Sequence, residues 1–114
     1  MKAYKVTKED MMGFPLKVEY YLDVENAKTR FSHYIKEYLD SKYLANEDDC
    51  KEYQSHPIKI NENPKSFNGT YKTLVEASVA LWERISYEYN EWDIHIKNVR
   101  VDEINLLGGT ADEK

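Results

Sequence analysis

Cysteine and long apolar runs are almost absent from this chain. The single cysteine, Cys50, excludes an intrachain disulfide and a cysteine-rich zinc site, which favours a reducing compartment. The longest apolar run, residues 79–82, is far shorter than the roughly 20 residues that cross a bilayer. Charged residues occupy positions 1–10, where an export signal would be apolar. We therefore expect a soluble protein of the cytoplasm.

Motifs that assemble catalytic or phosphate-binding groups are also missing. The sequence contains no Gly-x-Ser-x-Gly, no Walker-type loop and no Gly-x-Gly-x-x-Gly, so the known routes to a serine nucleophile or a phosphate cradle are absent. The acidic run Glu47, Asp48 and Asp49 lacks the spaced oxygen ligands and the turn glycine of a calcium loop. The same run opposes thiolate formation at Cys50, which we expect to be unreactive. No cofactor is expected, and a non-enzymatic role is favoured.

Basic residues are outnumbered, at 16 Lys or Arg against 21 Asp or Glu, and the formal net charge is −5. Residues 1–65 carry a net charge of −1, whereas residues 66–114 carry −4. An acidic surface repels phosphate backbones, and no basic stripe or Arg-rich segment is present. The composition disfavours direct binding to nucleic acid or a membrane and favours a protein with a basic surface as the partner.

Alternation of apolar and polar residues predicts two strands near the amino terminus, over residues 2–7 and 16–22. Gly13 and Pro15 allow the chain to reverse between them, so a hairpin is expected. In the second strand the expected buried residues are Leu16, Val18, Tyr20 and Leu22. Asp23 then occupies the N-cap position of a predicted helix over 24–39, whose apolar residues fall in one arc at about 100° per residue.

Residues 40–69 show little periodicity, and the only predicted strand there is 58–60. A connection of this length is unusual and is often functional, so the segment is a candidate site. The region around residues 70–89 has its apolar residues on one face of a helical wheel, which predicts a second helix. The alternative is a hairpin in which 81–89 pairs with 93–101. Beyond Trp92, alternation predicts a long final strand, with a β-bulge near Lys97 and Asn98 that would restore a common apolar face.

These elements predict an α+β domain over residues 1–107, with a loose tail at 108–114. The expected architecture is a mainly antiparallel sheet of three or four strands with two helices packed on one face. The expected core contains Tyr4, Leu16, Val18, Tyr20, Phe31, Tyr34, Ile35, Tyr38, Leu74, Leu81, Ile85, Ile94 and Ile96. Of the ten tyrosines, the expected exposed ones are Tyr21, Tyr43, Tyr53, Tyr71 and Tyr87.

Two groups of polar residues could carry chemistry. Glu91, Asp93 and His95 lie two apart on the predicted final strand, so they share a face and could converge on a metal ion or a substrate. This is the alternative of a small hydrolase or metal-binding protein, although a solvated strand face would show the same pattern. His33 and Glu37, four apart on the first helix, are expected to form a surface pair.

The remaining candidate is a surface for binding another protein. On the predicted second helix, Glu76, Glu83 and Glu91 line the exposed face with Tyr87, which could anchor the contact that the carboxylates steer. The acidic run in the 40–69 segment would extend this surface. The expected partner-binding residues are Glu47, Asp48, Asp49, Glu76, Glu83, Tyr87 and Glu91. A structural homo-oligomer, built on tyrosine-rich faces or an exposed sheet edge, is a further alternative.

The Lys-, Glu-, Asn-, Ile- and Tyr-rich composition and the short single-domain length resemble those of small accessory proteins of bacteriophages and mobile elements in AT-rich bacteria. The resemblance lies in composition and length and covers no defined motif. It implies a protein that inhibits a host defence or nucleic-acid-handling protein by occupying its basic surface.

Overall fold

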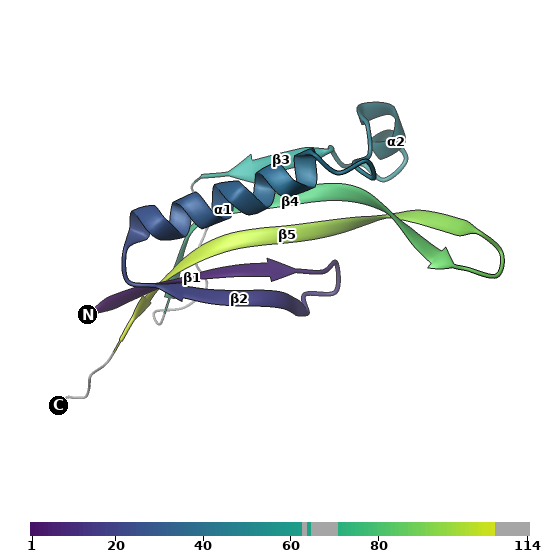
Figure 1. Ribbon diagram of the computed structural model, residues 1–114. Helices are drawn as coiled ribbons and strands as arrows, with labels where there is room; N and C mark the ends of the chain where they lie inside the picture. Colours follow the sequence, from purple (N-terminus) through teal and green to yellow (C-terminus); the bar gives the residue numbers. More distant parts are fainter. Residues whose placement is uncertain (63, 65–70, 107–114) are drawn as a thin grey trace.

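A computed structural model describes residues 1–62, 64 and 71–106 of the chain. The elements are β1 (Lys2–Glu9), β2 (Pro15–Tyr21), α1 (Val24–Leu39), α2 (Glu47–Lys51), β3 (Ile58–Asn61), β4 (Tyr71–Ser86) and β5 (Glu91–Asn105). The strands form one five-stranded sheet in the order β2-β1-β5-β4-β3, and every neighbouring pair is antiparallel (Figure 1). The α+β class is confirmed, with five strands in place of the three or four expected.

The amino-terminal hairpin and the first helix follow the sequence closely. In the turn between β1 and β2, Gly13 has φ +84°, a left-handed conformation that glycine adopts without steric cost. The Asp10 carboxylate accepts hydrogen bonds from the backbone N–H groups of Met12 and Phe14 at 2.9 Å each. Helix α1 begins after Asp23, whose side chain accepts a hydrogen bond from the backbone N–H of Glu25 at 2.8 Å. The predicted N-cap and both predicted helix bounds are therefore confirmed.

The second predicted helix is wrong, and the hairpin alternative is correct in topology but not in register, since Leu81 pairs with His95 and residues 87–89 lie in the turn. Residues 71–86 form β4, which pairs with β5 along nearly its whole length. The turn between them is short and contains Asn90 with φ 52°, a position that asparagine tolerates better than most residues. The side-chain period in this region is therefore 2 and not 3.6.

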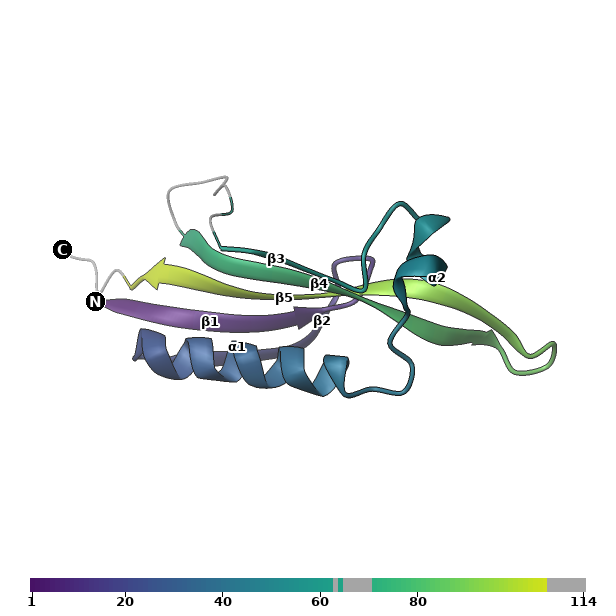
Figure 2. The ribbon, with the colours of Figure 1, turned by 90° about the horizontal axis from the view of Figure 1, so that it is seen from above.

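Helices α1 and α2 lie on opposite faces of the sheet, contrary to the expectation of two helices on one face (Figure 2). Neighbouring residues of a strand point to opposite faces. Val79 and Leu81 of β4 pack with α1 in the larger core, whereas Ala80 packs with Cys50 of α2 in a smaller one. The smaller core consists of Ala45, Cys50, Ala80 and Ile94, with Trp82 and Ile96 packed against it.

The placement of the two helices on opposite faces also explains the apolar pattern of β5. Its pairing with β4 is continuous from Asp93 to Val99, so there is no bulge near Lys97 and Asn98. Ile94 packs under α2, whereas Val99 packs under α1. The apolar phase shifts because the buried face of the strand changes along its length.

Strand β2 presents its apolar residues away from α1. The side chain of Glu19 contacts Arg30 and Tyr34 of α1, so the alternate residues face the opposite side of the sheet. Leu16, Val18, Tyr20 and Leu22 are 54%, 37%, 64% and 75% exposed, and the prediction that they are buried is wrong. Ile85 is exposed too, whereas the other predicted core residues are buried or partly buried.

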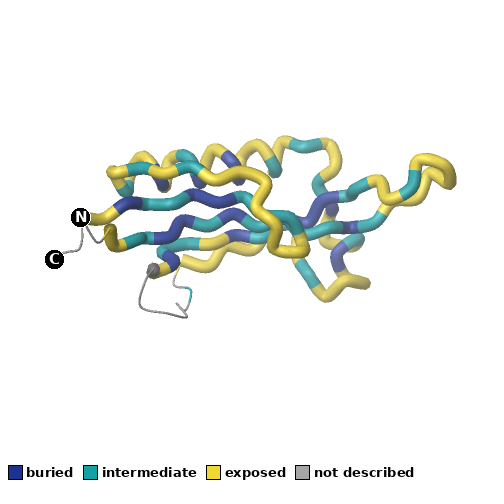
Figure 3. The backbone as a smooth tube through the Cα atoms, turned by 90° about the horizontal axis from the view of Figure 1, so that it is seen from below, coloured by how far each residue is buried: buried dark blue, intermediate teal, exposed yellow. Residues whose placement is uncertain are grey.

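The molecule is elongated, with principal extents of 58 × 27 × 23 Å. Both described ends of the chain lie at one end of the long axis, and the β4–β5 turn lies at the other, where the backbone is largely exposed (Figure 3). No helix in the described residues is long and apolar enough to cross a membrane. The predicted tail, 108–114, and the side chain of Tyr71 lie outside what the structure describes.

Candidate partner-binding site

The end of the molecule farthest from the termini is built on a two-stranded ribbon. Strand β1 pairs with β5 only from Asn98 onward, and β3 pairs with β4 only from Glu76 to Val79. Beyond these points β4 and β5 have only each other as paired strands among the described residues. A two-stranded ribbon is marginal in water, so it needs a covering segment.

Residues 43–57 supply that cover. The backbone N–H of Ala45 donates to the carbonyl of Ala80 at 3.0 Å, and that of Trp82 donates to the carbonyl of Tyr43 at 2.8 Å. The Ala80 N–H donates in turn to the carbonyl of Pro57 at 2.9 Å. These bonds satisfy the outer edge of β4 where β3 ends, and the apolar side chains of both segments meet in the smaller core. Residues 43–57 of the irregular segment are therefore a structural brace of the ribbon, and residues 63 and 65–69 lie outside what the structure describes.

Helix α2 explains much of the acidic run. Asn46 caps the helix, and its side chain accepts from the backbone N–H of Asp49 at 2.7 Å, while the Asp49 side chain accepts from the Asn46 N–H at 3.2 Å. Asp49 also accepts a hydrogen bond from the indole N–H of Trp82 at 3.1 Å. Asp49 therefore holds α2 to β4, whereas Glu47 and Asp48 extend into solvent.

Aromatic rings and one arginine form a row on the ribbon. Tyr43 stacks on Trp92 with ring centroids 5.6 Å apart. The Arg84 guanidinium lies 5.9 Å from the Trp92 ring centroid and 4.6 Å from that of Tyr87. Arg84 also donates to the backbone carbonyl of Tyr87 at 3.3 Å, which holds the turn against the row. Cation–π contacts of this kind contribute about 0.5–1 kcal/mol at exposed sites. The row is therefore ordered before any partner binds.

The net charge of the protein is concentrated in this region. We define the distal arm as residues 42–53 and 83–93. The distal arm carries eight Asp or Glu and three Lys or Arg, a net of −5, which equals the formal charge of the whole chain. The remaining residues are balanced. The exposed aromatic residues of the distal arm are Tyr43, Tyr53, Tyr87, Tyr89 and Trp92.

The structure brings together most of the predicted partner-binding residues but not all. Tyr87 is 81% exposed at the β4–β5 turn, and Glu91 is exposed where β5 begins. Glu83 is half-buried, and its carboxylate lies 2.5 Å from His95 Nδ1 and 2.5 Å from Lys97 Nζ. It therefore ties β4 to β5. Glu76 lies outside the distal arm, on the body of the sheet.

Glu91, Asp93 and His95 do not converge on a common point. The Asp93 carboxylate accepts a hydrogen bond from the Tyr53 hydroxyl at 2.5 Å, whereas His95 contacts Glu83. The hydrogen bond lowers the pKa of Asp93 and raises that of Tyr53. Within the described ranges, no group of three His, Cys, Asp or Glu side chains is arranged to hold a metal ion. The predicted surface pair of His33 and Glu37 is confirmed, at 3.5 Å.

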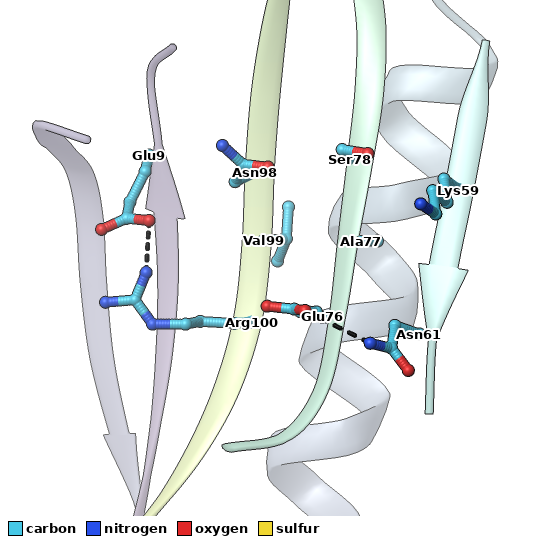
Figure 4. A pocket seen from close by; sticks show the side chains of 9 residues that line it. All are labelled: Glu9, Lys59, Asn61, Glu76, Ala77, Ser78, Asn98, Val99 and Arg100. Atoms are coloured by element: carbon cyan, nitrogen blue, oxygen red, sulfur yellow. Dashed lines mark hydrogen bonds and ion pairs between the residues drawn. The ribbon is translucent and has the colours of Figure 1, made fainter. Parts of the chain in front are cut away.

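A shallow hollow of about 400 Å³ lies on the body of the sheet, on the face opposite α1 (Figure 4). Arg100 of β5 forms an ion pair there with Glu9 of β1, and its Nε donates to Asp102 at 2.9 Å. Glu76 accepts a hydrogen bond from the Asn61 side chain at 3.5 Å. Arg100 is thus already paired with two carboxylates, which makes the hollow a less specific site for an anionic ligand.

Sequence reasoning missed two contributors to the distal arm, Arg84 and Trp92. Arg84 was assigned to the wrong secondary structure, since a helix over this region does not bring Arg84 close to Trp92 on the final strand. On paired strands the two are direct cross-strand partners. Counting outward from the turn does not pair them, because the register shifts between Arg84 and Ser86.

No protein family, no curated protein and no solved structure matches this chain. Its function is therefore argued from the arrangement of its own residues.

Proposed function

We propose that this protein is a non-enzymatic binding module whose distal arm docks on a basic surface of another protein. The observation that carries the proposal is the coincidence of the full net charge, −5, with five exposed aromatic residues at one end of an elongated molecule.

The two kinds of side chain have different roles in such a contact. Carboxylates such as Glu47, Asp48 and Glu91 steer a basic partner and raise the association rate, but exposed ion pairs contribute little affinity. Tyrosine and tryptophan bury large rings at low entropic cost and are enriched among the residues that dominate binding energy. Tyr87 is the best placed anchor because its ring is exposed and its backbone is held by Arg84.

The expected consequence of binding is inhibition. A basic groove that accepts a phosphate backbone would accept the distal arm, and the two ligands would then compete. The compositional resemblance to phage and mobile-element accessory proteins supports a host nucleic-acid-handling or defence protein as the partner. The proposed partner is thus a basic protein whose binding to nucleic acid competes with its binding to the distal arm.

The test compares capture of partners from a bacterial lysate by the wild-type protein, Tyr87→Ala and Glu91→Lys. A captured protein is identified, purified and titrated against each form at low and high salt. We expect the wild-type affinity to fall steeply with salt. Tyr87→Ala should bind at least tenfold more weakly, and Glu91→Lys should bind several-fold more weakly, mainly through slower association.

Glu37→Lys is the matched control, because it makes the same charge change on an exposed side chain of α1, outside the distal arm. It should bind as the wild type does. Equal affinity of all four forms, or affinity independent of salt, would reject the distal arm as the binding site.

A further inference from the structure

A second surface of the protein is apolar and lies at the edge of the sheet, on β2. Strand β2 is the outermost strand on its side, so in the described part of the chain its outer backbone groups pair with no strand. An unpaired edge can accept another strand. On the face opposite α1, β2 carries the exposed side chains of Leu16, Val18 and Tyr20. Single exposed apolar residues are ordinary, but a row of them along a free edge marks an interaction surface.

We propose that β2 pairs antiparallel with β2 of a second copy of this chain, about a two-fold axis at Val18, giving one continuous ten-stranded sheet. This inference concerns a surface separate from the distal arm and does not depend on the proposed function. The occupant is identified by the charges of the strand itself.

The charges of β2 select the register. A two-fold axis normal to the sheet leaves the α1 helices of both copies on the same side of the joined sheet. One residue of β2 must then lie directly opposite its own copy, and the axis passes between the two. With the axis at Val18, Lys17 of each copy faces Glu19 of the other on the α1 side. With the axis at Lys17 or at Glu19, two like charges would face each other, which is destabilising. Among these three registers, only the one centred on Val18 places Lys17 and Glu19 opposite each other.

The same register also pairs the apolar side chains on the face opposite α1. Val18 meets its own copy, and Leu16 meets Tyr20 of the second copy, as an aliphatic residue against an aromatic ring. Cross-strand pairs of this kind contribute about 0.2–1 kcal/mol each relative to alanine pairs. The exposed apolar row of one copy is thereby continued by that of the other. A neutral strand at this edge would place no carboxylate opposite Lys17.

In the monomer, Lys17 has no close ion-pair partner and acts on Glu19 of the same strand only at longer range. Within its own hairpin Lys17 lies directly opposite Lys8, which is a like-charge pair. None of the ion pairs formed by the described residues includes Lys17. Glu19 binds Arg30 and Tyr34 through one carboxylate oxygen, Oε1. Its carboxylate can therefore receive Lys17 of the second copy while it keeps its bonds to α1.

The first experiment measures the mass of the full chain over a range of concentrations by sedimentation. We expect a reversible dimer for the wild type and a monomer for Lys17→Glu, which places two carboxylates opposite each other twice. Glu19→Lys should likewise be monomeric. An equimolar mixture of the two variants should restore a dimer, because each lysine then faces a glutamate. Circular dichroism verifies that each variant is folded.

The second experiment tests the register without changing any charge. Val18→Cys should form a disulfide-linked dimer under mild oxidation, because directly opposite strand residues have Cα atoms about 4.5–5.5 Å apart, within disulfide range. Leu16→Cys lies on the same face but faces Tyr20, so it should not cross-link. The native Cys50 is fully buried and serves as the internal control.

A wild-type protein that stays monomeric at the highest soluble concentration would overturn the proposal. A dimer in which Val18→Cys and Leu16→Cys cross-link equally would overturn the register. A dimer that survives Lys17→Glu and Glu19→Lys unchanged would show that the copies meet elsewhere. None of these results bears on binding through the distal arm, so the two proposals fail separately.

Discussion

Glu19 is a charged residue on the covered face of a strand, and its surroundings explain why it is tolerated there. Its carboxylate accepts hydrogen bonds from Arg30 Nε, at 2.9 Å, and from the Tyr34 hydroxyl. The Arg30 bond and then the Tyr34 bond lower the pKa of Glu19. Burial, followed by the bond to Glu19, raises the pKa of Tyr34 to about 12. The polar face of β2 is thus fastened to α1 by a small hydrogen-bonded group.

This group makes stability sensitive to alkaline pH. The folded protein holds the Tyr34 proton more tightly than the unfolded chain, so this contribution is complete below pH 10 and is lost as pH rises from 10 towards 12. Tyr34→Phe should lower the free energy of unfolding by about 1 kcal/mol at neutral pH. It should also lose less stability than the wild type over the alkaline range. Urea denaturation at several pH values measures both effects, and Tyr89→Phe, an exposed tyrosine, should change neither.

At the scale of single elements, Glu83 determines how the ribbon is held on its α1 side. Burial alone would raise the pKa of Glu83, but hydrogen bonds from Lys97 and His95 outweigh it and lower the pKa below the usual 4.5. A carboxyl whose pKa is depressed by folding stabilises the folded state above its unfolded pKa. That contribution is lost as pH falls through the folded pKa.

Glu83→Gln should therefore melt at a lower temperature than the wild type at neutral pH, because Lys97 loses its counter-charge on the ribbon. In acid the two melting temperatures should converge, since the wild-type carboxyl is then protonated. Calorimetry across the acid range measures the difference. Glu88→Gln, in the exposed turn, is the control and should follow the wild type throughout. A constant difference between Glu83→Gln and the wild type at every pH would contradict the assignment.

The local signals of the sequence were sufficient for α1 and the first hairpin but not for β4. The N-cap at Asp23 and the turn glycine at Gly13 act within a few residues, so the sequence alone locates them. In β4 the alternation of Val75, Ala77, Val79 and Leu81 indicates a strand, but Ala80 and Trp82 obscure it. Ala80 is buried and Trp82 is partly buried because α2 covers the second face there, and a strand covered on both faces loses its alternation.

Alternation could not show either which face of β2 is covered by α1. A period of 2 defines two faces but does not say which one a helix covers. Here the covered face contains Glu19, because Arg30 and Tyr34 of α1 satisfy its charge. The partners are 11 and 15 residues away in the sequence, so no short pattern reveals them. The position of Arg84 beside Trp92 was missed for the same reason, since the two residues meet only through the pairing of β4 with β5.

At the scale of the whole molecule, the sheet supports two cores that differ in size. The larger lies under α1 and includes Val6, Phe31, Val79 and Val101, whereas the smaller lies between the ribbon and the 43–57 segment. The smaller core contains few side chains and is covered by a single short helix. Regions with few buried apolar contacts open at lower free energy than the rest of a protein. We therefore expect the brace on the ribbon to open without unfolding of the body.

Cys50 reports on this opening, because its side chain is completely buried in the smaller core and it is the only cysteine. A thiol reagent can reach it only when the 43–57 segment leaves the ribbon. We expect Cys50 to be labelled in the absence of denaturant, with a free energy of opening below that of global unfolding and a labelling rate that depends only weakly on urea.

Trp82→Phe removes the indole donor to Asp49 and should speed labelling several-fold while global stability falls little. Phe31→Leu, in the larger core, should lower global stability and leave the labelling rate in water unchanged. If Cys50 is labelled only through global unfolding, with the full urea dependence, the two cores form one cooperative unit and the distal arm is as rigid as the body.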